Sequence, residues 1–309
     1  LLKPLQVSGR RTIHTHPVKK DQEIRSALRF GATTFVVDNL DELKKLVPYR
    51  DRIGVLLRVT FRNQQAVVDL SRKFGCDAGE VAGIITAAEQ LGLHIKGLSF
   101  HVGSQCNDTS SHVEAIERCR QLMQEVNLSC SSPLSTLDIG GGFPADYTLS
   151  GLDIESFCAP IREALDKLPE DMHLLAEPGR FLIAPAVTSI TTVTGKSSRN
   201  GIFWYYLDDG VYGSYSGQIF DHASYPLQVL RQGETRRSIL AGPTCDSIDV
   251  IAEQISISPL SIGDIVVGHQ MGAYTSATST HFNLFDKAKI VAINQPVQNT
   301  DNVFQLNNS

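Results

Sequence analysis

Three segments of the sequence place glycine or polar residues directly after apolar, β-branched runs. They are His101-Val-Gly-Ser104, Asp138-Ile-Gly-Gly-Gly-Phe143 and Glu177-Pro-Gly-Arg180. Because glycine has no side chain, the backbone N–H groups of Gly140, Gly141 and Gly142 can approach an anion closely. The guanidinium of Arg180 matches the oxygens of a phosphate group. The three segments therefore indicate the mouth of one anion-binding pocket.

The elements that position these segments alternate between strands and helices over residues 1–185. We expect strands at Thr12–Thr15, Thr33–Val37, Val55–Val59, Gly97–Val102, Leu134–Ile139 and Leu174–Glu177. We expect helices at Gln22–Phe30, Asp41–Val47, Glu80–Leu91, His112–Val126 and Ile154–Leu168. This βα repeat is typical of a parallel sheet. No GxGxxG follows the first strand, and functional groups follow several strands, so the α/β pattern favours a TIM-type (β/α)8 barrel with about six strands visible.

Residues 186–309 show a different pattern. Runs of β-branched and aromatic residues predict strands at Thr188–Thr194, Ile202–Leu207, Ser238–Ala241, Asp264–Val267 and Lys289–Ile293. Helical periodicity remains at Ile248–Ile255. We therefore expect two domains, a barrel at 1–185 and a mostly antiparallel β domain at 186–309.

The composition excludes several classes of protein. A net charge of −5 argues against a general affinity for nucleic acid. No apolar run approaches the length that spans a bilayer, so no membrane partner is expected. The six cysteines show no paired spacing and no CxxC, which favours reduced thiols in the cytoplasm and predicts no metal site. The expected partner is a small molecule.

Three further segments complete a family pattern. They are Asp208-Asp-Gly-Val-Tyr-Gly-Ser214, Gly242-Pro-Thr-Cys-Asp246 and Gly272-Ala-Tyr-Thr275. Together the six segments resemble, in order, the motifs of the ornithine/lysine decarboxylase family, the alanine-racemase-like (fold type III) decarboxylases that depend on pyridoxal 5'-phosphate. The resemblance covers nearly the whole chain and is closer to the ornithine branch than to the diaminopimelate branch. It implies a carbon–carbon lyase that converts L-ornithine, and also L-lysine, to putrescine or cadaverine in polyamine biosynthesis.

The resemblance also implies roles for individual residues around the cofactor. Pyridoxal phosphate is an electron sink for the charge left when a carboxylate departs, and the sink is deepest when the ring nitrogen is protonated. Glu177 would stabilise that proton, and His101 would stack on the ring. The cofactor-binding residues implied by the resemblance are Arg58, His101, Ser104, Gly140, Gly141, Gly142, Glu177, Gly179, Arg180 and Tyr274.

The resemblance places substrate chemistry in the second half of the chain. Cys245 would return a proton to the α-carbon after CO₂ leaves, alongside His101 and Glu177 as catalytic residues. Asp221 and Asp246 would bind the distal ammonium of a basic amino acid, because a buried cation needs paired acids. Phe220 departs from the tyrosine common in this branch, which weakens selectivity for ornithine over lysine. The family presents Cys245 and Asp246 to the partner's pocket, which implies a homodimer with shared active sites.

One expected feature has no counterpart in this sequence. The family's cofactor lysine lies on the first barrel strand, and by its motifs this sequence begins after the second strand. Lys3, Lys19 and Lys20 do not match its context. Three explanations stay open: an upstream stretch of the same protein, which we favour, a fragment that needs a partner, or a non-catalytic decarboxylase-like regulatory binding protein. Retention of Cys245 favours an enzyme, with a diaminopimelate or arginine decarboxylase as further alternatives.

Overall fold

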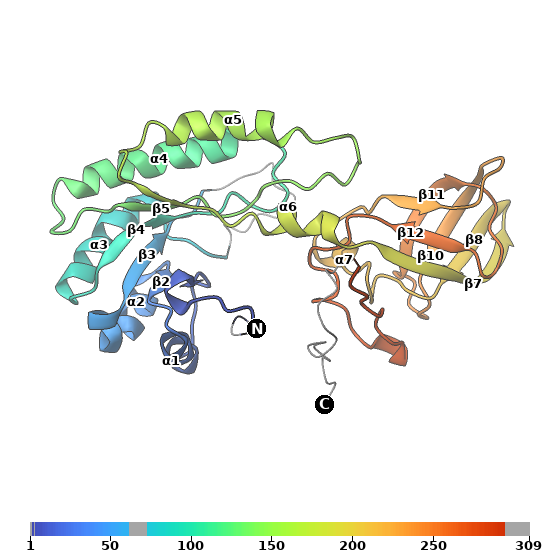
Figure 1. The fold of residues 1–309 in the computed structure, drawn as a ribbon, viewed down its shortest axis with the longest axis horizontal. Coiled ribbons are helices and arrows are strands. Elements are labelled where there is room, and N and C mark those ends of the chain that lie inside the picture. The colour runs from blue at the N-terminus through green and yellow to red at the C-terminus, as the bar shows by residue number, and fades with distance from the viewer. Residues whose placement is uncertain (1, 3, 62–72, 294–309) are drawn as a thin grey trace. The chain divides into compact units, whose positions relative to one another are not determined.

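The structure, a computed structural model, describes residues 2, 4–61 and 73–293, so that Lys3 lies outside the described residues. The chain divides into two compact units (Figure 1). The first contains Leu1–Ile190, Gly217–Val229 and Val266–Tyr274, and the second contains Thr191–Ser216, Leu230–Ile265 and Thr275–Ser309. The predicted domain boundary after residue 185 is a single one, whereas here two later segments, which contain Asp221 and Tyr274, belong to the first unit.

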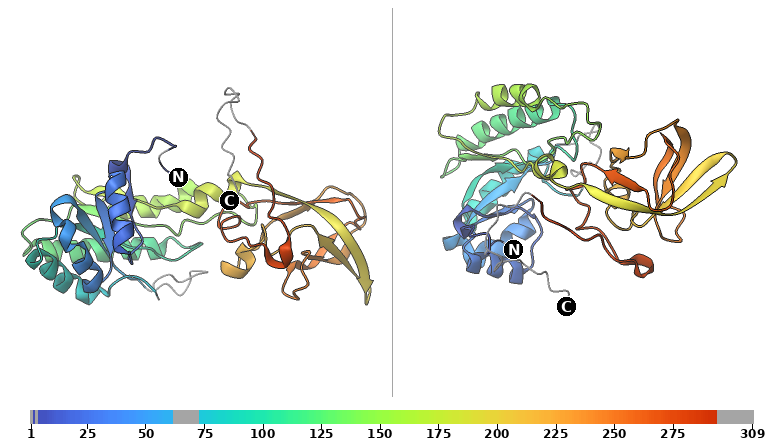
Figure 2. Two further views of the ribbon diagram at one scale, coloured as in Figure 1. Left: turned by 90° about the horizontal axis from the view of Figure 1, so that it is seen from below. Right: turned by 45° about the vertical axis from the view of Figure 1, so that its right-hand side comes forward.

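The first unit is built on a six-stranded sheet in which every neighbouring pair is parallel (Figures 1 and 2). Its strands, in spatial order, are β1 (Ile13–His14), β2 (Thr34–Val37), β3 (Gly54–Arg58), β4 (Ile95–Ser99), β5 (Thr136–Asp138) and β6 (His173–Leu175). The prediction of six strands of a TIM-type barrel is therefore confirmed. Strands β4, β5 and β6 end earlier than predicted, so the three polar segments lie at or just beyond their ends, and the third runs into helix α6 (Gly179–Ile183).

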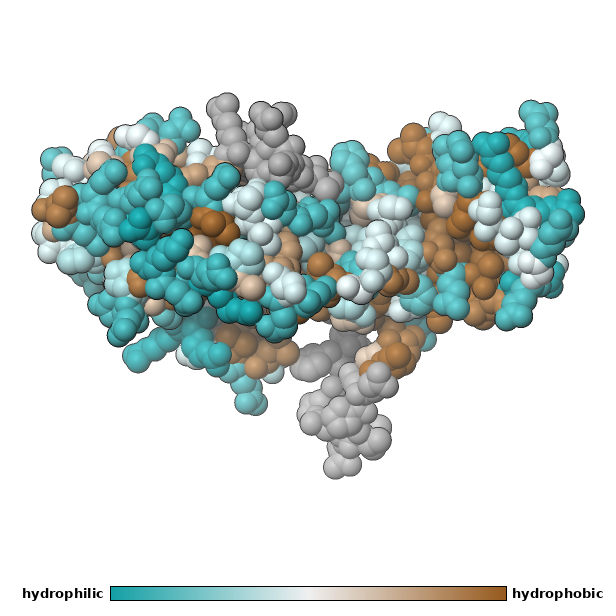
Figure 3. Space-filling model, turned by 90° about the horizontal axis from the view of Figure 1, so that it is seen from above, coloured by the Kyte–Doolittle hydropathy of each residue, from teal (hydrophilic) through white to brown (hydrophobic). Residues whose placement is uncertain are grey.

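In the part of the chain that the structure describes, five α-helices connect successive strands of this sheet, and a sixth follows β6. They are α1 (Asp21–Phe30), α2 (Leu40–Leu46), α3 (Val81–Gln90), α4 (Ser110–Asn127), α5 (Ile154–Leu165) and α6 (Gly179–Ile183). Asn39 caps α2, because its Oδ1 accepts from the amides of Asp41 and Glu42 at 3.0 and 2.9 Å. Helices α4 and α5 lie side by side, and Figure 3 shows mostly hydrophilic residues on their outer face. None of the helices within the described residues combines the length and hydrophobicity that crossing a membrane requires.

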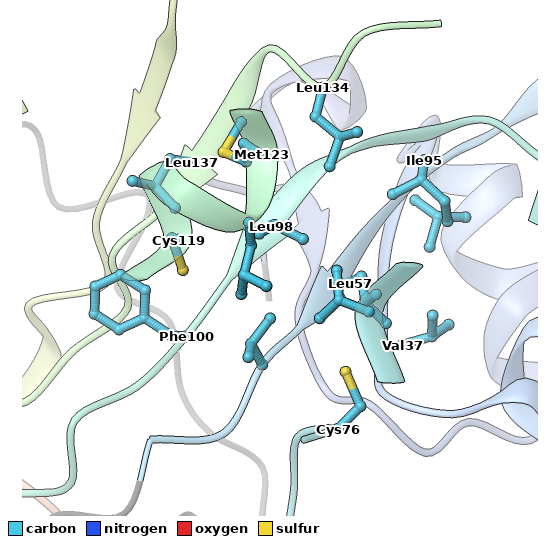
Figure 4. Close-up of a cluster of buried hydrophobic side chains, with 14 of the residues drawn as sticks. Val37, Leu57, Cys76, Ile95, Leu98, Phe100, Cys119, Met123, Leu134 and Leu137 are labelled. Carbon is cyan, nitrogen blue, oxygen red and sulfur yellow. The ribbon is translucent and has the colours of Figure 1, made fainter. Parts of the chain in front are cut away.

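The core of the first unit lies between the sheet and these helices. Figure 4 shows side chains of successive strands, such as Leu57, Leu98 and Leu137, gathered with Cys119 and Met123 of α4. All five side chains are buried. Each such apolar side chain contributes about 1.5–3 kcal/mol relative to exposure. This packing fixes the strand ends, and hence the loops that follow them.

Lys19 is one of the few charged side chains buried in this unit, with 2% of its surface exposed. Its Nζ donates to the carbonyl oxygens of His16, Pro17 and Val36 at 3.0, 2.6 and 2.5 Å. Burial lowers its pKa to about 8, although the carboxylate of Glu42 favours the charged form. Lys19 therefore ties the segment before α1 to strand β2.

The remaining strands are mostly antiparallel. They are β7 (Ser189–Arg199), β8 (Ile202–Leu207), β9 (Leu227–Val229), β10 (Arg236–Ala241), β11 (Val250–Ile257) and β12 (Ile265–Gly268), with the short helix α7 (Gly217–Phe220). The pairs β7–β8, β10–β11 and β9–β12 are antiparallel, whereas β8–β10 is parallel. The prediction of a separate, mostly antiparallel β domain is confirmed.

Two element predictions in this region are wrong. Ile248–Ile255 was expected to be helical, but residues 250–257 form strand β11. Lys289–Ile293 was expected to be a strand, but these residues form neither strand nor helix. The short strand β9 had no clear signal in the sequence.

Candidate active site

The side chain of Arg180, in the first turn of α6, is the centre of a polar cluster in the first unit. Arg180 is buried, and its Nε and Nη2 donate to the Ser104 hydroxyl at 3.3 and 3.1 Å. Its guanidinium carbon lies 4.9 Å from the centre of the Tyr274 ring, a cation–π contact. The structure therefore brings together three residues that the sequence assigned to one phosphate group.

Two further side chains hold the same guanidinium. Asp221 Oδ2 lies 3.0 Å from Arg180 Nη2, and Nη1 donates to the Tyr147 hydroxyl at 2.9 Å. Burial lowers the pKa of Arg180, but Tyr147 and Asp221 outweigh it and raise that pKa above its ordinary value. Asp221, which the sequence assigned to the substrate ammonium, thus pairs with the predicted phosphate ligand. A cavity of about 170 Å³ adjoins these three residues, with Gln105 on its wall.

The glycine turn after β5 has no room for side chains. Gly140 has a φ of 63°, and a Cβ there would lie 2.0 Å from the carbonyl oxygen of Phe100. A Cβ at Gly141 would lie 2.7 Å from the carbonyl oxygen of Glu177 and 2.9 Å from His101 Nε2. The turn therefore requires glycine and lies directly against His101.

The amide of Gly140 is engaged inside this turn. It donates to Oδ1 of Asp138 at 2.9 Å, so it serves the turn itself, although the sequence assigned all three glycine amides to the anion. Asp138 is 2% exposed, and burial, together with the negative charge of Glu177, raises its pKa to about 6. Asp138 is the buried acid of the site, and the sequence had not assigned it a role.

The other predicted cofactor residues of the first unit lie around the same turn. His101 Nδ1 accepts from the amide of Gly103 at 3.0 Å, and burial, followed by Arg58, lowers the His101 pKa to about 4. The imidazole is therefore neutral at pH 7. Glu177 is exposed, and its amide donates to the carbonyl oxygen of Gly140 at 2.7 Å. Arg58 ends β3, where burial lowers its pKa despite the nearby charge of Glu177.

Three further predicted residues lie next to Arg180 or Asp221. Gly179 is the first residue of α6, and a Cβ there would lie 3.8 Å from the Tyr274 hydroxyl. Tyr274 is 52% exposed. Phe220, which ends α7 beside Asp221, is 57% exposed. No three His, Cys, Asp or Glu side chains gather as a metal site within the described residues.

Cys245 and Asp246 belong to the second unit, in the loop after β10. Cys245 is exposed, and its Sγ lies 3.6 Å from Oδ1 of Asn283. Asp246 accepts a hydrogen bond from the Tyr212 hydroxyl, which lowers the Asp246 pKa. The Tyr212 ring stacks on Phe282 with centroids 4.3 Å apart. The predicted proton donor and its neighbouring acid are therefore presented on an ordered loop.

The buried carboxylate of Asp249 holds that loop. It accepts from the amide of Val211 at 2.9 Å, and from the amide and hydroxyl of Thr244 at 2.9 and 2.7 Å. A Cβ at Gly210 or Gly242 would lie 2.2 or 2.1 Å from Asp249 Oδ1. The segment that carries Cys245 is thus fastened to the segment that carries Tyr212.

Sequence reasoning missed Tyr147 and Gln105, which contact the predicted site residues or the loop beside them. Gln105 directly follows Ser104, and Tyr147 lies five residues after Gly142. Both therefore fall in strand-end loops already singled out for the site. Their position in these loops was the available signal.

Comparison with known proteins identifies relatives of the whole chain. A family model described as pyridoxal-dependent decarboxylase, pyridoxal binding domain, matches residues 2–184. A solved structure of lysine/ornithine decarboxylase from Vibrio vulnificus, complexed with cadaverine, is 52% identical with a TM-score of 0.90. The match covers 95% of this chain and 79% of that one.

Two further relatives differ in the function that their names state. Lysine/ornithine decarboxylase of Selenomonas ruminantium is 38% identical, over 92% of this chain and 72% of its own length. Antizyme inhibitor 2 of Xenopus laevis is 33% identical, over 94% of this chain and 67% of its own length. The chain thus spans between two-thirds and four-fifths of the proteins that it matches.

Proposed function

The chain belongs to the pyridoxal-dependent decarboxylase family, and on that premise we propose that it decarboxylates L-ornithine, with L-lysine as a second substrate. The products would be putrescine and cadaverine, in polyamine biosynthesis. One observation carries the proposal: a buried arginine and a serine hydroxyl supply donors for an anion, and the carboxylate of Asp221 pairs with the same arginine.

The residues of the first unit fit pyridoxal 5'-phosphate. Arg180 and the Ser104 hydroxyl are donors suited to phosphate, and the turn at Gly141 keeps side chains away from His101. When bound, this cofactor supplies an electron sink for the charge left by a departing carboxylate. In our proposal Arg180, Ser104 and Tyr274 bind its phosphate and His101 contacts its ring as a neutral imidazole.

Three carboxylates and one thiol would bind the substrate or hold and transfer protons. Glu177 would hold a proton at the ring nitrogen, as a carboxylate favours a neighbouring cation. Asp221 and Asp246 would bind the distal ammonium, and Cys245 would donate a proton to the α-carbon. We propose that Cys245 and Asp246 act in the pocket of a second copy, so that the active form is a homodimer with shared sites. The six free cysteines support a reducing compartment such as the cytoplasm.

The test measures CO₂ released by the full-length protein, with pyridoxal phosphate, from L-ornithine, L-lysine, L-arginine and diaminopimelate. We expect release from ornithine and lysine. Release only from arginine or diaminopimelate would move the chain to another branch of the family. Cys245→Ala should impair product formation, whereas Cys130→Ala, at a half-buried thiol, is the matched control and should not.

A second candidate function is a non-catalytic regulatory binding protein. The similarity to antizyme inhibitor 2 favours it. It predicts no CO₂ release from any of the four amino acids, with or without cofactor. Turnover of ornithine or lysine excludes it.

A further inference from the structure

Tyr147 contacts Arg180, the arginine proposed to bind phosphate, but the proposed function gives Tyr147 no role. Its hydroxyl accepts a hydrogen bond from Nη1 of Arg180 at 2.9 Å. Nε and Nη2 of the same guanidinium contact Ser104, and Nη2 also pairs with Asp221. Three side chains therefore hydrogen-bond or ion-pair with the edges of this planar group, and Tyr147 is the partner at Nη1.

The loop that carries Tyr147 is fastened to the loop after β4. Oε1 of Gln105 accepts from the amide of Ala145 at 3.0 Å, and its Nε2 donates to the Ala145 carbonyl oxygen at 2.6 Å. This pair of hydrogen bonds fixes the backbone two residues before Tyr147. Because Gln105 follows Ser104 directly, one loop positions two partners of Arg180.

On its other side the loop is closed by Asp146. One carboxylate oxygen accepts from the amide and hydroxyl of Thr148 at 3.0 and 2.8 Å, and the other from the amides of Gly151 and Leu152 at 2.7 and 3.2 Å. These bonds lower the Asp146 pKa far below its ordinary value. The loop is therefore folded on its own residues, with Tyr147 at a fixed position.

The ring of Tyr147 is held as well. It packs edge-on against Tyr225, with ring centroids 5.7 Å apart. Tyr225 follows Asp221 by four residues, so this segment supplies both the ring contact and the carboxylate that pairs with Arg180. This ring contact restricts the movement of the Tyr147 hydroxyl away from the guanidinium.

We propose that Tyr147 is a positioning residue, which holds the Arg180 guanidinium in the orientation that binds the phosphate group of the cofactor. This inference rests on the proposed function. Arginine has a flexible stem, and a guanidinium fixed in advance loses less conformational freedom when it binds a phosphate. Tyr147 and Asp221 contact different Nη atoms, so removal of one hydroxyl releases the plane on one side while the ion pair stays.

The experiment compares Tyr147→Phe with the unchanged full-length protein by calorimetric titration with pyridoxal 5'-phosphate and, separately, with pyridoxal, which lacks the phosphate. We expect Tyr147→Phe to weaken binding of the phosphate form about tenfold, as for loss of a hydrogen bond to a charged group. Binding of pyridoxal should change less than about twofold, because no phosphate is present for Arg180 to bind. Tyr206→Phe is the matched control, since its hydroxyl also accepts from an arginine, Arg199 Nη2, at 3.3 Å.

The outcomes distinguish failure of the positioning role of Tyr147 from failure of the proposed function. If the unchanged protein binds neither compound, the proposed function fails and the inference with it. If that protein binds pyridoxal phosphate and Tyr147→Phe binds it equally well, or loses both compounds equally, the positioning role is wrong. Gln105→Leu is a second variant that leaves the tyrosine in place, and it should weaken binding of the phosphate form selectively, in the same sense.

Discussion

The buried carboxylate of Asp138 should make the free energy of unfolding depend on pH. Its ordinary pKa is 3.8, whereas burial and the charge of Glu177 raise the pKa in the folded protein to about 6. Between these values the folded protein binds more protons at this position than the unfolded chain. The free energy of unfolding therefore falls as the pH rises through this range.

The expected size follows from these two values. The difference between 3.8 and about 6 corresponds to about 3 kcal/mol, lost between pH 4 and pH 6. The attraction of Arg58 is already included in the raised value. Asp138→Asn removes the ionisation and keeps a side-chain oxygen that accepts from the amide of Gly140. The variant should therefore be up to about 3 kcal/mol more stable than the parent protein at pH 7, and equal to it near pH 3.5.

Urea unfolding at a series of pH values measures this difference. The quantity of interest is the variant's free energy of unfolding minus that of the parent protein. For Asp138→Asn it should rise between pH 4 and pH 6, whereas for Asp171→Asn, at an exposed aspartate, it should stay constant. A difference for Asp138→Asn that does not change with pH would refute the reasoning.

Three further changes are expected to destabilise the first unit. Gly140→Ala should cost about 2–4 kcal/mol in urea unfolding, because its Cβ meets the Phe100 carbonyl oxygen. Gly151→Ala is the control, with a φ of 86° and no atom within 4 Å of the new Cβ, and an equal cost there would rule out the clash as the cause. Lys19→Met leaves three carbonyl oxygens without their donor and should cost about 3 kcal/mol, and an unchanged unfolding midpoint would contradict this. Asn39→Ala should cost about 1 kcal/mol by loss of the α2 cap, which thermal unfolding followed by circular dichroism can detect, and unaltered stability would mean that the cap contributes nothing.

The barrel strands could be predicted because their signals are local. Val36 and Val37, or Leu56 and Leu57, lie in short apolar runs that end at polar or glycine residues, and buried parallel strands have this pattern. The exact ends were less predictable. Strand β5 ends at Asp138, although Ile139, which follows it, is apolar and still donates its amide to Leu175 of β6.

The error at Ile248–Ile255 has a specific cause. Ile248, Ile251 and Ile255 have helical spacing, but β11 contains an irregularity that breaks its two-residue period. Ser238 pairs with Ile255 and Leu240 with Ala252, so two steps along β10 match three along β11. Gln254, with a φ of 57°, lies at this point. A bulge of this kind depends on the partner strand, which a local pattern does not show.

The site could be predicted as far as it depends on strand ends. Ser104 and Arg180 meet because parallel strands deliver their following loops to the same edge of the sheet. The contact of Tyr147 with Arg180 depends on a loop that Asp146 folds locally and that Gln105 fastens from 40 residues away, and the second interaction has no local signal in the sequence. The pairing of Asp221 with Arg180 likewise joins positions 41 residues apart.

The carboxylate of Asp249 also limits how this region can vary. Its oxygens fill the space beside Gly210 and Gly242, so a side chain at either glycine conflicts with the acid. The atoms nearest a Cβ at Gly242 all belong to the acid, whereas a Cβ at Gly210 also meets the Cα of Gly242 at 2.8 Å, and shortening the acid deprives Val211 and Thr244 of their acceptor. A pairwise mutational scan should therefore detect Gly242 and Asp249 as a linked pair, whereas Gly210 should resist change whatever the acid is.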